Sequence, residues 1–369
     1  MRLYQLDTLR FVFALYVVTG HTMCWIGAVR NGQLAVDFFF VLSGFVLSRQ
    51  LALEPRSLKS FAMARFARLW PLHVFTLFLV LAILPQSNAW EITANVFMMQ
   101  DVGFFDHLTV NHPAWSVSAE FVIGILFLFP VAKYRLTFIA AILATACAII
   151  LLRATQGIDS LHTKPFGITT YGLVRCTMGC MLGYLTFEAH RALSTKIWRG
   201  WTVEALQIGA TVTLLFMFAM PLNNSGKLAT VGLACLVILV LCRDGLLARV
   251  LSDRKIRWSG SLSYGIYLIH FPVLVWFILA GYLPHDVVLA EALAKGEAGV
   301  YYAPLAAFYM TVLFLAFAAS RLIEMPCKKA LMSSARSAQP SMSAANDRRS
   351  FTSEPAGPRS TTLGPLAAE

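Results

Sequence analysis

Apolar segments long enough to cross a membrane as helices recur along nearly the whole chain. A bilayer core is spanned by about 20 mostly apolar residues in an α-helix, so the pattern predicts an all-α, multi-pass membrane protein. The ten predicted spans are residues 6–26, 34–53, 69–85, 115–132, 136–152, 171–187, 202–222, 228–242, 261–283 and 302–323. Only 13% of the 369 residues are charged, whereas soluble domains carry about a quarter. This composition argues against a second, soluble catalytic domain.

The positions of the basic residues predict the orientation. Most of the 30 Lys and Arg residues fall on the side that would also carry both termini, and such an excess marks cytoplasmic loops. We therefore expect both termini in the cytoplasm and the protein in the inner (plasma) membrane. The net charge of +11 also attracts anionic lipid or an anionic substrate, but its scatter predicts no nucleic-acid partner. Residues 1–332 are expected to form the membrane domain, and residues 333–369 a disordered cytoplasmic tail.

Arg10 and His21 are the leading polar pair within a predicted span. Eleven helical residues make roughly three full turns, so the two side chains share one face and lie about 16 Å apart along the axis. This arrangement predicts a cation near the cytoplasmic entrance of a channel and a titratable imidazole deeper in it. The alternative is structural: Arg10 pairs with Asp7, and His21 is hydrogen-bonded to a neighbouring helix.

Other ionisable residues within the predicted spans are also candidates, since charges in hydrocarbon usually face a bundle interior or a wet cavity. Glu120 lies in the fourth span, and Arg175 lies at a similar predicted depth. The alternative to a functional role for Glu120 is therefore a structural ion pair with Arg175. His270 is expected near the middle of the membrane, preceded by Tyr264, where a satisfied interior histidine is the simpler interpretation.

Arg65 and Arg68 are placed by this topology on an inner loop, at helical spacing. They either mark the cytoplasmic side or bind phosphate groups, for which the planar guanidinium group is well suited.

These residues fall in segments that resemble the acyltransferase-3 family of membrane acyltransferases. The matching segments are LDTLRFVFALYVVTGH, with Arg10 and His21; VDFFFVLSGFVLS, with Asp37 and Ser43; RFARLWP, with Arg65 and Arg68; WSVSAEF, with Glu120; RCTMGCMLGYL, with Arg175; LSYGIYLIHFPVL, with Tyr264 and His270; and RLIEMP at 321–326. They follow the family's order from residue 6 to about residue 330. The chain departs from the family at Phe121, where a second acid is common, and at Thr8, where Gly is common.

The resemblance implies transfer of an acyl group, acetyl in particular, from cytosolic acyl-CoA to a hydroxyl of a glycan or exopolysaccharide precursor. His21 would act as general base or, less simply, as an acyl carrier, and Glu120 would orient it or bind the acceptor. Arg10, Arg65 and Arg68 would bind CoA. The residues expected to bind the acceptor or to serve as structural polar groups are Asp37, Ser43, Arg175, Tyr264 and His270. Acyl-CoA would be a substrate, with no tightly bound cofactor, and the seven cysteines show no metal-site spacing.

Two other functional classes fit the sequence. In a transporter, the ionisable residues of the spans would form a substrate or proton path. Turnover of acyl-CoA by the purified protein would distinguish an acyltransferase from a transporter. The other class is a non-catalytic relative that serves as a binding or regulatory subunit. The presence of both Arg10 and His21 counts against it, because a degenerate copy is free to lose them.

Overall fold

The computed structural model describes residues 3–22, 31–85, 87–154, 164, 167, 169–194, 200–284 and 299–337, and among these residues it is helical, with no strand. The α-helices are α1 (Tyr4–Thr22), α2 (Leu34–Leu53), α3 (Leu58–Ile83), α4 (Ala89–Val96), α5 (Trp115–Ile123), α6 (Phe129–Tyr134), α7 (Thr137–Leu152), α8 (Tyr171–Leu193), α9 (Gly200–Ala219), α10 (Asn224–Leu241), α11 (Leu246–Leu251), α12 (Ser263–Leu279), α14 (Gly299–Ala319) and α15 (Met325–Ser337). A π-helical turn, Gly124–Leu128, joins α5 to α6, and another, Ser320–Glu324, joins α14 to α15. The all-α prediction is confirmed.

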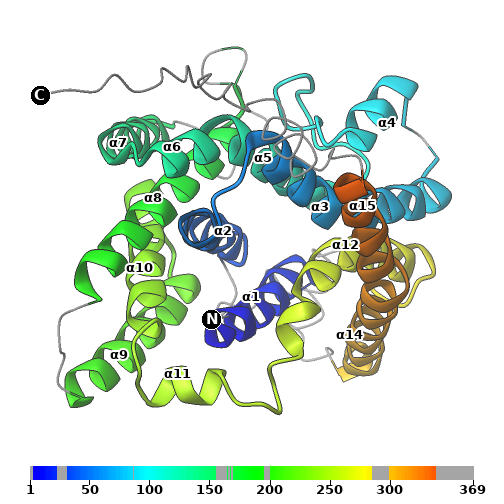
Figure 1. Ribbon diagram of the computed structural model, residues 1–369. Coiled ribbons are helices and arrows are strands. Elements are labelled where there is room, and N and C mark those ends of the chain that lie inside the picture. Colours follow the sequence, from blue (N-terminus) through cyan, green and yellow to red (C-terminus); the bar gives the residue numbers. More distant parts are fainter. Residues whose placement is uncertain are drawn as a thin grey trace, which may run out of the picture.

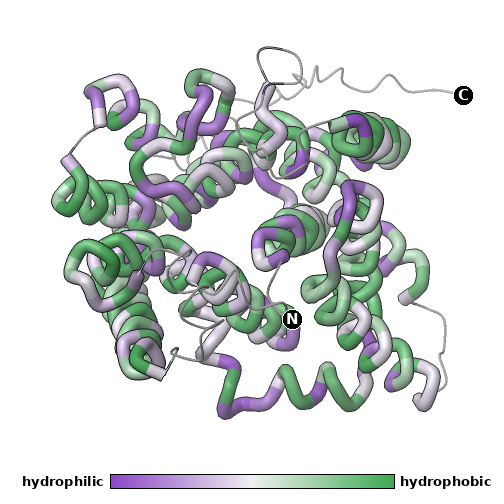
Figure 2. The backbone as a smooth tube through the Cα atoms, turned by 180° about the vertical axis from the view of Figure 1, so that it is seen from behind, coloured by the Kyte–Doolittle hydropathy of each residue, from purple (hydrophilic) through white to green (hydrophobic). Residues whose placement is uncertain are grey.

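Six helical stretches of the described chain are long and apolar enough to cross a membrane. They are Leu34–Leu53, Leu58–Ile83, His112–Tyr134, Gly200–Ala219, Asn224–Leu241 and Gly299–Ser333, and α7 and α12 are shorter apolar helices. Each of the ten predicted spans overlaps a helix, and apolar residues run along most of the helices (Figure 2). A multi-pass membrane protein is thus supported, while the count of ten and the sides of the termini stay predictions. Of the predicted tail, α15 includes 333–337, and 338–369 lie outside the described residues.

The third helix begins earlier than predicted, so the expectation that Arg65 and Arg68 lie on a loop is wrong. Ser57 caps α3, its side chain accepting a hydrogen bond from the backbone N–H of Ser60 at 3.2 Å. The following segment, LKSFAMARFARLW, is rich in good helix formers. Both arginines are therefore held on a helix that packs into the bundle, one turn apart on the same face.

Helix α2 lies among the other helices and contacts α1, α6, α8 and α10 (Figure 1). Its approach to α8 is close because small residues meet there. A Cβ atom added at Gly44 would collide with the carbonyl of Cys180, and one added at Gly183 would collide with the carbonyl of Val41. Such small residues let membrane helices pack backbone to backbone, which gives α2 and α8 a fixed relative position.

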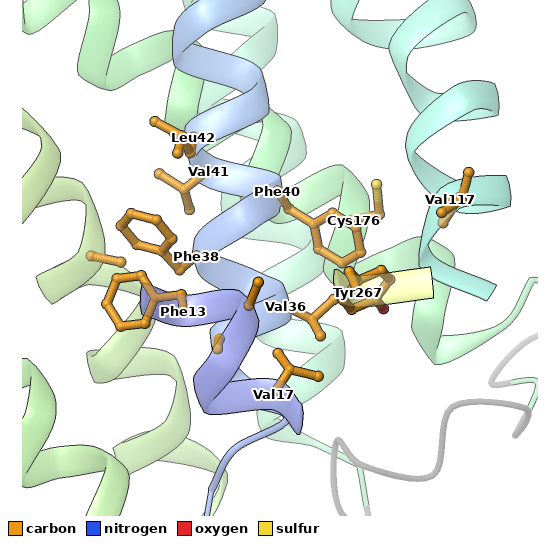
Figure 3. Packing of buried hydrophobic residues seen from close by; sticks show 14 of the residues in the cluster. Phe13, Val17, Val36, Phe38, Phe40, Val41, Leu42, Val117, Cys176 and Tyr267 are labelled. Carbon is orange, nitrogen blue, oxygen red and sulfur yellow. The ribbon is translucent and has the colours of Figure 1, made fainter. Parts of the chain in front are cut away.

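Aromatic side chains fill the space between α1, α2 and α9. The ring of Phe13 lies 4.2 Å from that of Phe38 and 5.6 Å from that of Phe218, measured between centroids. All three residues are buried, and Figure 3 shows Phe13 and Phe38 facing each other from α1 and α2. Edge and tilted ring contacts of this kind add to the burial of apolar surface. The packing holds α1, and with it Arg10 and His21, against α2.

Candidate active site

Three of the predicted cationic residues line one cavity, which we call the basic cavity. Its polar lining comes from five helices: Arg10 on α1, Ser43 and Gln50 on α2, Arg65 and Arg68 on α3, Ser116 and Glu120 on α5, and Ser263, Tyr264 and Tyr267 on α12. The apolar remainder includes Val36 and Phe39. The predicted grouping of Arg10 with Arg65 and Arg68 is thus realised in space.

Glu120 is held by α2 and α3. Its Oε1 accepts a hydrogen bond from Nη2 of Arg65 at 2.7 Å and another from the hydroxyl of Ser43. The alternative pairing of Glu120 with Arg175 is therefore not observed, because α5 turns the carboxylate toward the basic cavity. Three guanidinium groups against one carboxylate leave this cavity with an excess of positive charge, although Arg10 also lies 3.6 Å from Asp7.

A second cavity, the entrance cavity, adjoins the basic cavity, and Leu47, Gln50, Arg65 and Arg68 line both. The entrance cavity adds Arg56, from the segment before α3, and Lys328, from α15. No carboxylate is among its lining residues, but Arg56 pairs with Glu54 at 2.6 Å. The two cavities together form a continuous basic surface that suits a ligand with several phosphate groups.

His21 lies in a third cavity, the histidine cavity, which is lined by His21, Gln33, Val36, Leu108, His112, Pro113, Trp115, Arg175 and Tyr267. The Nδ1 atom of His21 is 2.9 Å from the carbonyl oxygen of Val17 on the same helix. Because a carbonyl oxygen only accepts, Nδ1 must carry the proton, which leaves Nε2 of the neutral ring as the basic atom. The lining residues include no carboxylate, so Val17, and not Glu120, sets the tautomer of His21.

His270 adjoins His21, with ring centroids 5.1 Å apart. Its Nδ1 is 3.2 Å from the carbonyl oxygen of Ile266, which again assigns the proton to Nδ1. The residue is fully buried, and its Nε2 has no hydrogen-bond partner among the described residues. The prediction of a satisfied interior histidine therefore holds for one ring nitrogen and fails for the other.

Asp37 and Arg175 form a buried ion pair between α2 and α8. Nε of Arg175 is 3.0 Å from Oδ1 of Asp37, and Nη2 is 2.6 Å from Oδ2. Two parallel hydrogen bonds of this kind fix both side chains, and the guanidinium group also lies 5.7 Å from the ring centroid of Trp115. Arg175 thus reaches the histidine cavity with its charge balanced. Tyr264 is similarly engaged, donating to the carbonyl of Leu69 at 2.7 Å.

Arg10 and His21 share one helix face but open into different cavities. Sequence reasoning did not select Tyr267, which lies between these cavities, or Lys328, which was counted only as a topological signal. The signal for Tyr267 was its spacing three residues before His270, on the same face of α12.

Comparisons with known proteins identify the family of the chain. Residues 3–324 match the acyltransferase-3 family model, described as an acyltransferase domain. The chain is 25% identical over 276 residues to an acyltransferase, MdmB, of Streptomyces mycarofaciens, covering 66% of this chain and 68% of that protein. It is 24% identical over 313 residues to the peptidoglycan O-acetyltransferase OatA of Listeria monocytogenes, covering 73% of this chain and 49% of the relative.

The O-acetyltransferase OatA of Staphylococcus aureus is 24% identical over 332 residues, covering 78% of this chain and 54% of the relative. The chain thus spans about half the length of these two O-acetyltransferases. No solved structure matches the chain. Because the family model extends over nearly all of the helical part of the chain, from α1 to the turn before α15, the protein belongs to the acyltransferase-3 family.

Proposed function

We propose that the protein transfers an acyl group, acetyl in particular, from cytosolic acyl-CoA to a hydroxyl of a glycan or exopolysaccharide precursor in the inner membrane. The observation that carries the proposal is the adjacency of a strongly basic pair of cavities and a cavity that holds a histidine with a defined tautomer. Acyl-CoA acts in this proposal as a substrate, and no tightly bound cofactor takes part.

The basic and entrance cavities support a CoA donor. The phosphate groups of CoA need several cations, and Arg10, Arg65 and Arg68 supply them in one cavity. The one carboxylate among its described lining residues, that of Glu120, is already bonded to Arg65. The apolar side chains that line the same cavity, such as Phe39 and Val46, suit the less polar pantetheine arm. Glu120 has a positioning role here, because it holds Arg65 and Ser43 at the wall of the cavity.

His21 is the candidate general base. Acyl transfer to an alcohol requires removal of the hydroxyl proton as the acyl carbon is attacked, and a base that titrates near neutral pH is suited to this. The hydrogen bond from Nδ1 to Val17 leaves Nε2 to accept the proton. The ion pair of Arg175 with Asp37 keeps the adjacent cation balanced, so the histidine cavity favours a neutral, hydroxylated acceptor.

The relatives support an alcohol as the acceptor, because two of them are named O-acetyltransferases and one of these is named for peptidoglycan. At 24% identity, these relatives support the class of reaction, transfer of an acyl group to a hydroxyl. A glycan or exopolysaccharide precursor is the acceptor that we propose.

The test uses the full chain in lipid nanodiscs with acetyl-CoA labelled in the acetyl group. We expect release of the CoA thiol that depends on a glycan acceptor, and label in an ester that mild base removes. Cells with and without the gene should differ in the ester-linked acyl content of their surface glycan. If the protein turns over no acyl-CoA and vesicles that contain it accumulate intact solute, the protein is a transporter and not an acyltransferase.

A further inference from the structure

Two side chains separate the basic cavity from the histidine cavity. Among the described residues, Val36 on α2 and Tyr267 on α12 are the two that line both. They are only 4% and 6% exposed, respectively, and both are labelled in Figure 3. Both side chains thus lie where the two cavities adjoin.

The hydroxyl of Tyr267 is fixed from two directions. It donates a hydrogen bond to the carbonyl oxygen of Pro113 at 2.8 Å and lies 2.7 Å from the hydroxyl of Ser116. The Ser116 hydroxyl also lies 3.2 Å from the carbonyl oxygen of Pro113, so the two hydroxyls share this acceptor and either can donate to the other. Pro113 precedes α5 and Ser116 lies in its first turn, so the two bonds tie α12 to the start of α5.

The ring of Tyr267 also stands in a row of rings that leads from one cavity to the other. Its centroid is 6.1 Å from that of Phe39, which lines the basic cavity, and 6.1 Å from that of His270. His270 is in turn 5.1 Å from His21 in the histidine cavity. The position of Tyr267 is therefore coupled by packing to both the donor side and the histidine side.

We propose that Tyr267, together with Val36, is a positioning residue that holds the acyl thioester at this partition and keeps water of the histidine cavity away from it. The proposal rests on the proposed function. In transfer, the acceptor oxygen bonds to the acyl carbon, the carbon–sulfur bond breaks, and the hydroxyl proton passes through His21 to the CoA thiolate. Water that reached the same carbon would instead yield the free acid and the CoA thiol, so an intact partition favours transfer over hydrolysis.

The test compares thiol release with and without acceptor in nanodiscs. Tyr267→Ala opens the partition, and we expect the ratio of hydrolysis to transfer to rise about tenfold, because water exclusion is lost. Tyr267→Phe keeps the ring but loses both hydrogen bonds, and its ratio should rise by a smaller factor. Tyr184→Phe is the matched control, because it also removes a buried tyrosine hydroxyl, one that contacts Thr137 at 3.0 Å and lines neither cavity.

Val36→Ala widens the same partition from α2 without touching a hydrogen bond, and it should raise the ratio in the same direction. A merely structural role of Tyr267 would lower both rates together and leave the ratio unchanged. If the wild type transfers normally and the ratio is unchanged in Tyr267→Ala and Val36→Ala, the proposed role of the partition is wrong, but the proposed function stands. If the wild type neither transfers nor hydrolyses, the proposed function itself fails.

Discussion

The basic cavity and the histidine cavity adjoin but differ in their balance of charge. The first holds three guanidinium groups and the carboxylate that bonds one of them. The second holds imidazole and aromatic groups, and its one guanidinium group, that of Arg175, is neutralised by Asp37. Charge is thus concentrated where the proposed polyanionic donor would bind, and it is balanced where the proposed acceptor hydroxyl would lose its proton.

Under the proposed function, this difference gives different roles to two residues of one motif. Arg10 and His21 lie on one face of α1, yet they line different cavities, which share Val36 of α2 and Tyr267 of α12. Donor recognition and proton transfer are therefore expected to be separable by mutation. A histidine change should alter the rate without altering donor affinity, and an arginine change should do the reverse.

The largest difference between the effect on transfer rate and the effect on donor affinity is expected for His21→Ala. Loss of a general base typically lowers the rate about 10² to 10⁴-fold, and the donor should still bind because its cations lie in the other cavity. The measurements are the transfer rate in nanodiscs and acetyl-CoA affinity by titration. His107→Ala is a suitable control, because this histidine has a 61% exposed side chain and contacts Glu91 away from the three cavities.

Near-normal transfer by His21→Ala would remove His21 from the mechanism, both as base and as acyl carrier. Trapping of an acyl group on His21 in the wild type would instead favour the carrier. His270→Ala should chiefly reduce stability or acceptor use, since its buried ring supports that of His21.

Arg68→Gln in the basic cavity should have the opposite pattern, a loss of donor affinity with little change in rate. A hydrogen bond to a charged group contributes about 1.5–3 kcal/mol, so we expect KM for acetyl-CoA to rise about tenfold or more, with kcat little changed. High salt should weaken donor binding by the wild type in the same direction. Arg249→Gln is the charge-matched control, because it removes an exposed arginine that pairs with Asp244 on the surface.

Arg65→Gln should add a loss of stability, because it leaves the carboxylate of Glu120 without its 2.7 Å partner. The double variant with Glu120→Gln should recover part of that stability but not the donor affinity. If a well-inserted Arg65→Gln, Arg68→Gln protein has an unchanged KM for acetyl-CoA, the two arginines do not bind the donor and serve only to set the topology.

Much of the fold was predictable because apolar length is a property of the chain alone. Each predicted span overlaps a helix, and the motif residues on α1, α2 and α3 do gather around the cavities. The start of α3 was missed because Arg65 and Arg68 lower the local hydropathy, although the segment that contains them is a good helix former.

The partners of individual side chains were less accessible to sequence reasoning. Depth in the membrane suggested Arg175 for Glu120, but a partner also depends on which way each helix faces, and α5 turns Glu120 toward Arg65. Tyr267 could not be assigned a place between cavities, because cavities arise from the packing of five helices. Only spatial contacts distinguish it from Tyr264, one turn away on the same helix.

The smallest expected effect concerns Lys328, which extends the basic surface beyond the residues that match the family model. Lys328→Gln should raise KM for acetyl-CoA several-fold or less, because exposed ion pairs contribute about 0.2–1 kcal/mol, and the increase should shrink at high salt. Lys329→Gln is the matched control, since it removes the same charge from the next residue of α15, which does not line the entrance cavity. Equal KM values for the two variants at low salt would confine the donor to α1 and α3, whereas a larger value for Lys328→Gln would extend the donor site to the C-terminal helix.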